Sequence, residues 1–98
     1  LILNEIKLDI DSYSTFINDK KIDLTRTEFL LLEALIKNQG RVLSRDQLVK
    51  RKRIWGDDKI IYDRTIDVHV KNLREKLASS GKIIKTVRGI GYIIDTND

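Results

Sequence analysis

The segment that most constrains the fold is DRTIDVHVKNLREKL, residues 63–77, in which apolar residues recur with the period of an α-helix. Its apolar positions follow one another at steps of four, three and four: Ile66, Val70, Leu73 and Leu77. This spacing predicts a helix with one buried side, packed against another helix or a sheet. The same steps place a second set on the opposite side: Arg64, Val68, Lys71, Asn72 and Glu75. That side is mainly basic and polar, as expected for a helix that lies against a negatively charged partner.

A small antiparallel sheet is predicted at the start of the chain. Residues 5–11, EIKLDID, alternate apolar and charged side chains, which is the period of a half-buried strand. Two further apolar runs flank Asn18-Asp19-Lys20, whose side chains suit a tight turn.

Two capping boxes mark the starts of two more helices. In TRTE, the Thr25 side chain is placed to accept from the Glu28 amide while the Glu28 side chain accepts from the Thr25 amide. SRDQ pairs Ser44 with Gln47 in the same way. The run FLLLEALI after the first box is apolar almost all round, which predicts a central helix that Gly40 ends.

The segment KIIKTVRGIGYII, residues 82–94, predicts a β-hairpin. Its two β-rich runs bend at residues 88–91, where glycines permit positive φ and Arg88 lies at the tip. Strands, three helices and a basic-tipped hairpin, in this order, are the parts of an α+β winged helix. In this variant of the helix-turn-helix, one helix enters the major groove of DNA and the hairpin flanks it.

Composition supports one intracellular domain that binds a polyanion. The 98 residues are enough for one core, and we take residues 1–98 as a single domain. The chain has no cysteine, no signal peptide and no run long enough to span a bilayer, so we expect a cytoplasmic protein without membrane contact. Residues 1–49 carry seven basic and eight acidic side chains, whereas residues 50–98 carry twelve and seven. The basic surface therefore belongs to the second half, although such an excess is also compatible with an ordinary solvated surface.

Several blocks resemble a known family in order and at nearly the expected spacing. TRTEFLLLEAL, GRVLSRDQL, IWG, DRTIDVHVKNLREKL and IKTVRGIGY are similar to successive parts of the OmpR/PhoB-type DNA-binding domain of bacterial response regulators. The resemblance implies an N-terminal four-stranded antiparallel sheet, three helices and a C-terminal β-hairpin wing. It also implies an upstream receiver domain that is phosphorylated in a two-component phosphorelay. Because the sequence contains no methionine, we expect that receiver domain to be missing from this chain.

The same resemblance implies a recognition helix over about residues 64–77 and a wing over about residues 83–94. It also implies that these residues contact DNA: Arg64, Val68, His69, Lys71, Asn72, Arg74, Thr86, Arg88 and Trp55. Arginine and lysine donate the charge-assisted hydrogen bonds that phosphates accept, and the methyl groups of Val68 can pack on a thymine methyl. Many relatives have arginine where this chain has Asn72. An asparagine amide can pair with adenine N6 and N7, so the site read here is expected to be A·T-rich.

Several of these positions have a structural alternative. His69 lies close to the buried stripe and is either a packing residue or a phosphate donor. Trp55 either lies near a phosphate or fills the core, and Thr86 is either a DNA contact or an ordinary strand residue. Asp63 and Asp67 lie four positions apart near the helix start, where carboxylates serve the cap and the helix dipole more often than a metal.

These patterns predict a DNA-binding output domain with no enzymatic activity, cofactor or metal. One histidine and no cysteine leave no nucleophile and base to pair. We expect tandem half-sites and a dimer on DNA. A protein-interaction module is the rival interpretation, since the loop at residues 56–62 resembles the family segment that contacts RNA polymerase; both functions can coexist.

The segment VKRKRIWG departs from the family pattern by one extra Lys-Arg pair. A continuous helix would turn the following Ile54 and Trp55 by roughly 200°. Burying Trp55 is worth more than one turn of helix, so we expect the second helix to end early or bulge between Lys50 and Arg53. The spare charges are expected beside the DNA backbone.

Overall fold

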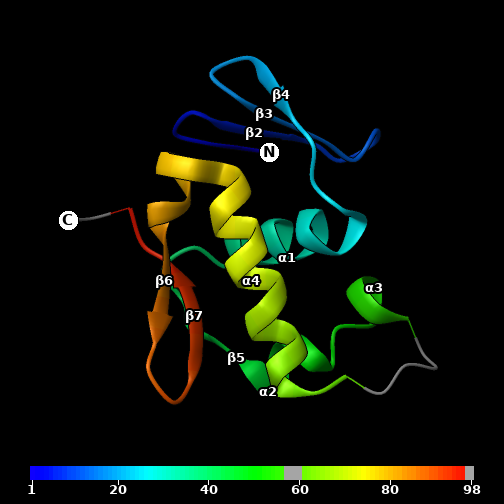
Figure 1. The fold of residues 1–98 in the computed structure, drawn as a ribbon, viewed down its shortest axis with the longest axis vertical. Coiled ribbons are helices and arrows are strands. Elements are labelled where there is room, and N and C mark those ends of the chain that lie inside the picture. The colour runs from blue at the N-terminus through cyan, green and yellow to red at the C-terminus, as the bar shows by residue number, and fades with distance from the viewer. Residues whose placement is uncertain (57–60, 97–98) are drawn as a thin grey trace.

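The computed structural model describes residues 1–56 and 61–96, and begins with the predicted antiparallel sheet (Figure 1). Its strands, in spatial order, are β1 (Ile2–Leu3), β2 (Ile6–Asp9), β3 (Ser14–Ile17) and β4 (Lys20–Ile22). Asn18 and Asp19 form the two-residue turn between β3 and β4, with φ values of 50° and 66°. Such left-handed turn residues match the twist of a hairpin, so the turn prediction is confirmed.

Helix α1 (Arg26–Lys37) follows the first capping box and lies in the centre of the molecule. Both hydrogen bonds of the box are present: the Glu28 amide donates to Thr25 Oγ1 over 3.2 Å, and the Thr25 amide donates to Glu28 Oε1 over 2.9 Å. Every residue from Glu28 to Ile36 is buried, as the all-round apolar pattern predicted. Figure 1 shows α1 between the N-terminal sheet and the long helix α4 (Asp63–Leu77).

The second helix ends early, as the extra Lys-Arg pair predicted. Helix α2 (Arg45–Val49) begins after the Ser44 capping box and ends at Val49. The backbone at Arg51 is extended, with φ −77° and ψ 98°. A separate single turn, α3 (Lys52–Trp55), then places Ile54 and Trp55 in the core. The break absorbs the insertion because burying these two side chains is worth more than the lost helical hydrogen bonds.

The C-terminal hairpin packs beside α4 as part of a second sheet. After α4 comes a 3₁₀ helix, η1 (Ala78–Ile83), and the sheet contains, in order, β5 (Leu43–Ser44), β7 (Gly91–Ile94) and β6 (Ile84–Val87). The sequence did not predict β5, a two-residue strand with no pattern of its own. Gly89 has the predicted positive φ, of 76°. Gly91 lets the backbone of β7 approach β5 closely, since a Cβ there would lie 2.0 Å from the Leu43 carbonyl oxygen.

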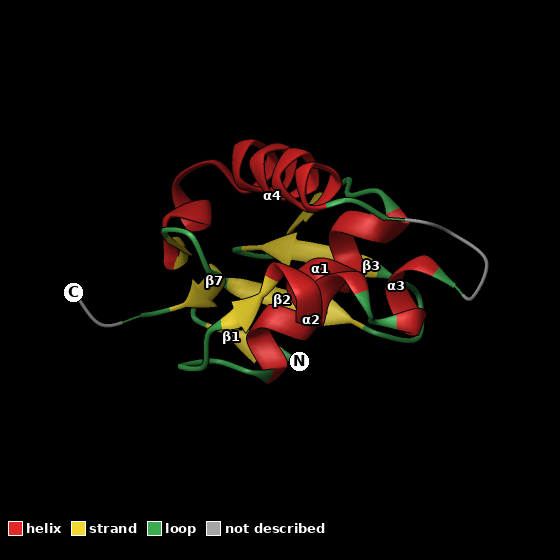
Figure 2. Cartoon of the chain, turned by 90° about the horizontal axis from the view of Figure 1, so that it is seen from below, coloured by secondary structure: helices red, strands yellow, loops and turns green. Residues whose placement is uncertain are grey.

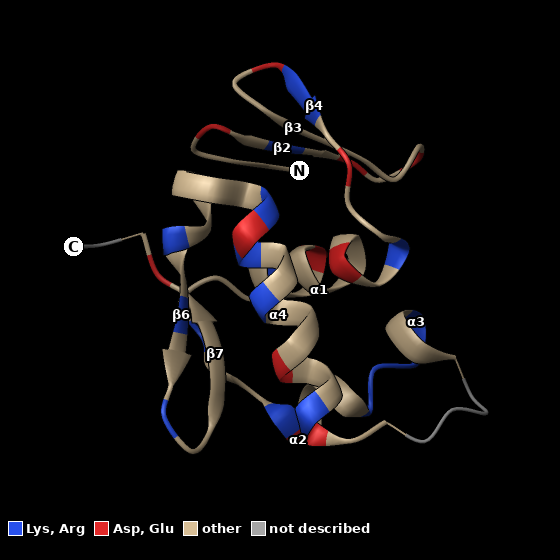
Figure 3. Cartoon of the chain, viewed as in Figure 1, with Lys and Arg blue, Asp and Glu red and all other residues tan. Residues whose placement is uncertain are grey.

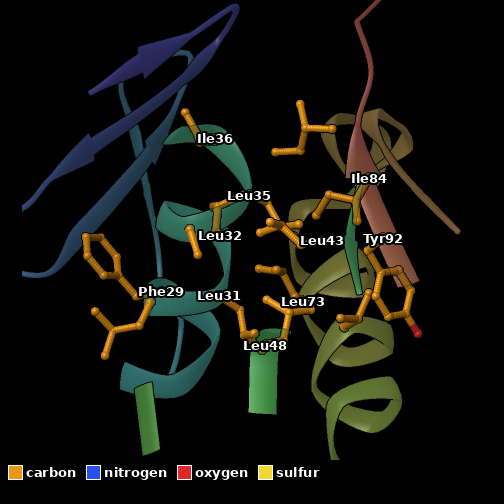
Figure 4. Close-up of a cluster of buried hydrophobic side chains, with 14 of the residues drawn as sticks. Phe29, Leu31, Leu32, Leu35, Ile36, Leu43, Leu48, Leu73, Ile84 and Tyr92 are labelled. Atoms are coloured by element: carbon orange, nitrogen blue, oxygen red, sulfur yellow. The ribbon is translucent and has the colours of Figure 1, made fainter. Parts of the chain in front are cut away.

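One core joins the two sheets and the helices. The α4 stripe is fully buried, with Ile66, Val70 and Leu73 each at 0% exposure. Figure 4 shows side chains of α1 meeting Leu48 of α2 and Leu73 of α4 at its centre. Seen from below in Figure 2, α4 forms one outer layer of the molecule. Since its apolar stripe is buried in the core, the opposite side of the helix faces outward. Within the described ranges, no helix has the length and apolarity needed to cross a membrane.

Candidate nucleic-acid interface

The outward side of α4 presents the predicted polar set. Arg64, Val68, Lys71, Asn72 and Glu75 are all exposed. Val68 is 56% exposed, which is high for an aliphatic side chain in the middle of a helix. An exposed valine between cations can contact the methyl group of a thymine while its neighbours contact phosphates.

Arg64, Lys71 and Arg88 are exposed cations on this side of the molecule. Figure 3 shows lysine and arginine along α4 and at the turn between β6 and β7. Arg64 and Lys71 of α4 and Arg88 of the turn are exposed, and within residues 1–56 and 61–96 none of them makes a hydrogen bond or ion pair through its side chain. Their charges are therefore available to a polyanion.

Arg74 and Thr86 are brought together by the fold. Arg74 Nε donates to the Ile84 carbonyl oxygen over 2.9 Å, and Arg74 Nη2 donates to Thr86 Oγ1 over 2.8 Å. The guanidinium also lies over the ring of Tyr92, 5.4 Å from its centroid. Arg74 is half-buried, and its two best-placed donors already connect α4 to β6. DNA contact by Arg74 and Thr86 stays a prediction. Thr86 lies in a strand, as one of its two alternatives expected, whereas the structural role of Arg74 was not indicated by the sequence.

Asp67 anchors a second connection between α4 and the hairpin. Its Oδ1 accepts from Arg45 Nε over 2.8 Å and from the Tyr92 hydroxyl over 2.5 Å. Burial raises the pKa of Tyr92, and the hydrogen bond to Asp67 raises it further, so the hydroxyl remains a donor at neutral pH. Among the described residues, no three His, Cys, Asp or Glu side chains gather as metal ligands would. No sequence signal pairs Arg45 with a residue 22 positions away.

Trp55 and His69 pack against each other. Their ring centroids are 5.6 Å apart, Trp55 is 7% exposed, and its Nε1 donates to the Leu48 carbonyl oxygen over 2.8 Å. The indole N–H is thus already used inside the protein, which favours the core alternative for Trp55, while its DNA contact stays a prediction. Trp55 is a core residue. His69 is half-buried against it, which favours the packing alternative for His69.

The extra basic pair is only partly directed to solvent. Arg53 makes a two-pronged ion pair with Glu33 of α1, with Nε to Oε1 at 2.8 Å and Nη2 to Oε2 at 3.2 Å. Glu33 is 3% exposed, and the hydrogen bond from Arg53 holds its pKa below the usual value although burial opposes this. Lys37 also lies 3.5 Å from Glu33. Arg53 is therefore engaged by Glu33, because a buried carboxylate needs a cationic partner. The expectation that the spare charges lie beside DNA stays a prediction.

The loop predicted to contact RNA polymerase, residues 56–62, lies largely outside the described residues, which exclude 57–60. At its end, Tyr62 is 70% exposed.

Known proteins resemble this chain in both sequence and fold. A family model described as "Transcriptional regulatory protein, C terminal" matches residues 19–94. The response regulator ArlR of Staphylococcus haemolyticus is 42% identical over 94 residues, which is 94% of this chain and 42% of that protein. The sensory transduction protein RegX3 of Mycobacterium tuberculosis is 40% identical over 93 residues, covering 92% of this chain and 40% of that protein. The chain thus spans about two-fifths of the length of these curated relatives.

Solved structures of response-regulator DNA-binding domains have the same fold. The DNA-binding domain of CpxR from Escherichia coli superposes with a TM-score of 0.80 at 33% identity, covering 96% of this chain and 93% of that one. The DNA-binding domain of the response regulator AdeR, solved in complex with an intercistronic region, superposes with a TM-score of 0.83 at 30% identity, covering 99% and 100%.

Proposed function

This chain belongs to the OmpR/PhoB-type family of transcriptional regulatory C-terminal domains, and we propose from that membership that it binds double-stranded DNA in a sequence-specific way. It would act as the output domain of a two-component response regulator. The family consists of DNA-binding transcription regulators, not enzymes. The observation that carries the proposal is the outward side of α4, where Val68 is exposed between cations and the hairpin lies alongside.

We place α4 in the major groove and the hairpin at the minor groove. Asn72 would pair with an adenine edge and Val68 would contact a thymine methyl, while Arg64 and Lys71 bind phosphates. Arg88 would enter an adjacent minor groove, where narrow A·T tracts concentrate negative potential. The preferred site is therefore A·T-rich.

The assembly around the domain is part of the proposal. We propose that residues 1–98 form one DNA-binding domain, that a receiver domain of the same protein controls it, and that two copies bind tandem half-sites in the cytoplasm. The support is the family membership and the response-regulator names of relatives more than twice as long as this chain. We also propose that residues 56–62 contact RNA polymerase, supported by the family resemblance and by the exposed Tyr62.

Selection from random duplexes tests the proposed function. The protein should enrich a recurring A·T-rich motif arranged as two tandem half-sites, and should bind the selected duplex more tightly than a scrambled duplex of equal composition. A selection that yields no motif, or equal affinity for the two duplexes at every salt concentration, would contradict sequence-specific binding. A motif without a tandem repeat would contradict only the proposed dimer.

A further inference from the structure

We propose that Arg74 and Asp67 of α4 are positioning residues that hold the hairpin in place, so that the helix and Arg88 read DNA as one rigid unit. The inference rests on the proposed function, because it concerns how the proposed DNA-reading surface is organised. It assigns to Arg74 a role other than the phosphate contact that the family resemblance implies.

Arg74 fastens the outer strand of the hairpin. Among the strands that the structure describes, β6 lies at the edge of the second sheet and pairs with β7 alone. The forked guanidinium crosses from α4 to this strand, binding the Ile84 carbonyl with Nε and the Thr86 hydroxyl with Nη2. Two parallel donors fix the direction as well as the position of the strand, which a single ammonium group cannot do.

Asp67 fastens the inner strand at a separate point. The Tyr92 hydroxyl of β7 donates to Asp67, and Arg45 of α2 donates to the same carboxylate oxygen. The Tyr92 ring is 3% exposed and lies between two guanidinium groups, 5.3 Å from that of Arg45 and 5.4 Å from that of Arg74. Each strand of the hairpin is therefore tied to α4 by a polar side chain of α4 itself.

These connections fix the distance between the two DNA-reading elements. Arg88 follows Thr86 by two residues, and the last strand pair before the turn is Val87 with Gly91. The turn carrying Arg88 consequently starts from a strand end that Arg74 holds. A hairpin ordered before binding loses less conformational freedom on contact with DNA, so the Arg88 contact gains in strength.

A double-mutant cycle with Arg88 tests the coupling. Binding affinity is measured for two duplexes that share the selected motif and differ only in an A·T or G·C flank. The four proteins compared are wild type, Arg88→Ala, Arg74→Lys and the double variant. Wild type should prefer the A·T flank, and Arg88→Ala should remove that preference. In the Arg74→Lys background the effect of Arg88→Ala should shrink by at least about twofold, the lower end of coupling between residues in one network. Lysine keeps the charge of Arg74, so a simple phosphate contact would leave the effect of Arg88→Ala unchanged and overturn the proposal.

Thr86→Val serves as a second variant, because it removes only the hydroxyl that accepts from Arg74. It should reduce the flank preference in the same direction as Arg74→Lys, and an unchanged preference would count against the proposal. Hydrogen exchange in the protein without DNA gives a readout that does not depend on the proposed function. Arg74→Lys should speed exchange of the β6 and β7 amides while α1 stays protected. Unchanged exchange in the hairpin would overturn the proposal that Arg74 holds it in place. A wild-type protein that binds motif and scrambled duplexes equally would instead contradict the proposed function.

Discussion

Replacing Trp55 with phenylalanine separates a core role from a DNA-contact role. The substitution keeps an aromatic ring beside His69 but removes the indole N–H that binds the Leu48 carbonyl. That carbonyl still accepts a longer bond from the Arg51 amide, at 3.3 Å. Losing a donor to a buried carbonyl costs about 1–2 kcal/mol. The smaller ring adds about 1 kcal/mol for the volume left unfilled.

The free energy of unfolding is therefore expected to fall by about 2–3 kcal/mol. For a domain of this size it corresponds to a fall of about 10–20 °C in the melting temperature. Thermal unfolding followed by circular dichroism measures the shift. Fluorescence anisotropy, at a temperature where the variant stays folded, measures affinity for the selected duplex, which should be unchanged. Tyr62→Phe is the control, since its 70% exposed ring should change stability by no more than about 0.5 kcal/mol. Normal stability with weakened DNA binding in Trp55→Phe would refute the core assignment.

Other consequences follow from Asn72 and from the two buried carboxylates of α1. Asn72→Arg should shift preference from adenine towards guanine at one position of each half-site, by about 1–3 kcal/mol; an unchanged motif after selection would mean that residue 72 does not face a base. Arg53→Met should lower the melting temperature, whereas the control Lys50→Met, which breaks an exposed pair with Asp46, should not; equal effects would contradict the role of Arg53. Glu28, paired with Lys76, and Glu33 both have pKa values below 4.5 in the folded state, so they stabilise it above that pH. Chemical denaturation at several pH values should show this stability disappearing as the pH falls below about 4.5, and less pH dependence in Arg53→Met.

Local sequence signals predicted most of the fold. Both capping boxes, the turn at Asn18-Asp19 and the buried stripe of α4 formed as predicted, because each depends on residues within a few positions of one another. The break after α2 was also predictable, since an insertion of two residues conflicts with burying Trp55.

The polar contacts between elements were not predictable in the same way. Arg53 pairs with Glu33 and Arg74 pairs with Thr86, across 20 and 12 positions respectively. A sequence shows that such side chains are charged or polar, but not which of them the fold will place within bonding distance. The exposure of the outward side of α4 was predictable from the helical spacing, and DNA contact by its residues stays a prediction. The sequence left two alternatives open for Trp55, because an exposed tryptophan and a buried one look alike in a single sequence, and its burial favours the core alternative.

The salt dependence of affinity for the selected duplex, compared among wild type, Lys71→Ala and Lys21→Ala, shows whether the outward side of α4 binds DNA. Lys71 lies on the outward side of α4, and Lys21 is also exposed but lies in β4, at the far end of the molecule (Figure 3). Each phosphate contact contributes about 0.9 to the slope of log affinity against log salt concentration. We predict that Lys71→Ala makes the slope shallower by about that amount while Lys21→Ala leaves it unchanged. A slope that is the same in all three proteins, or that becomes shallower only in Lys21→Ala, would contradict DNA binding by this side of α4.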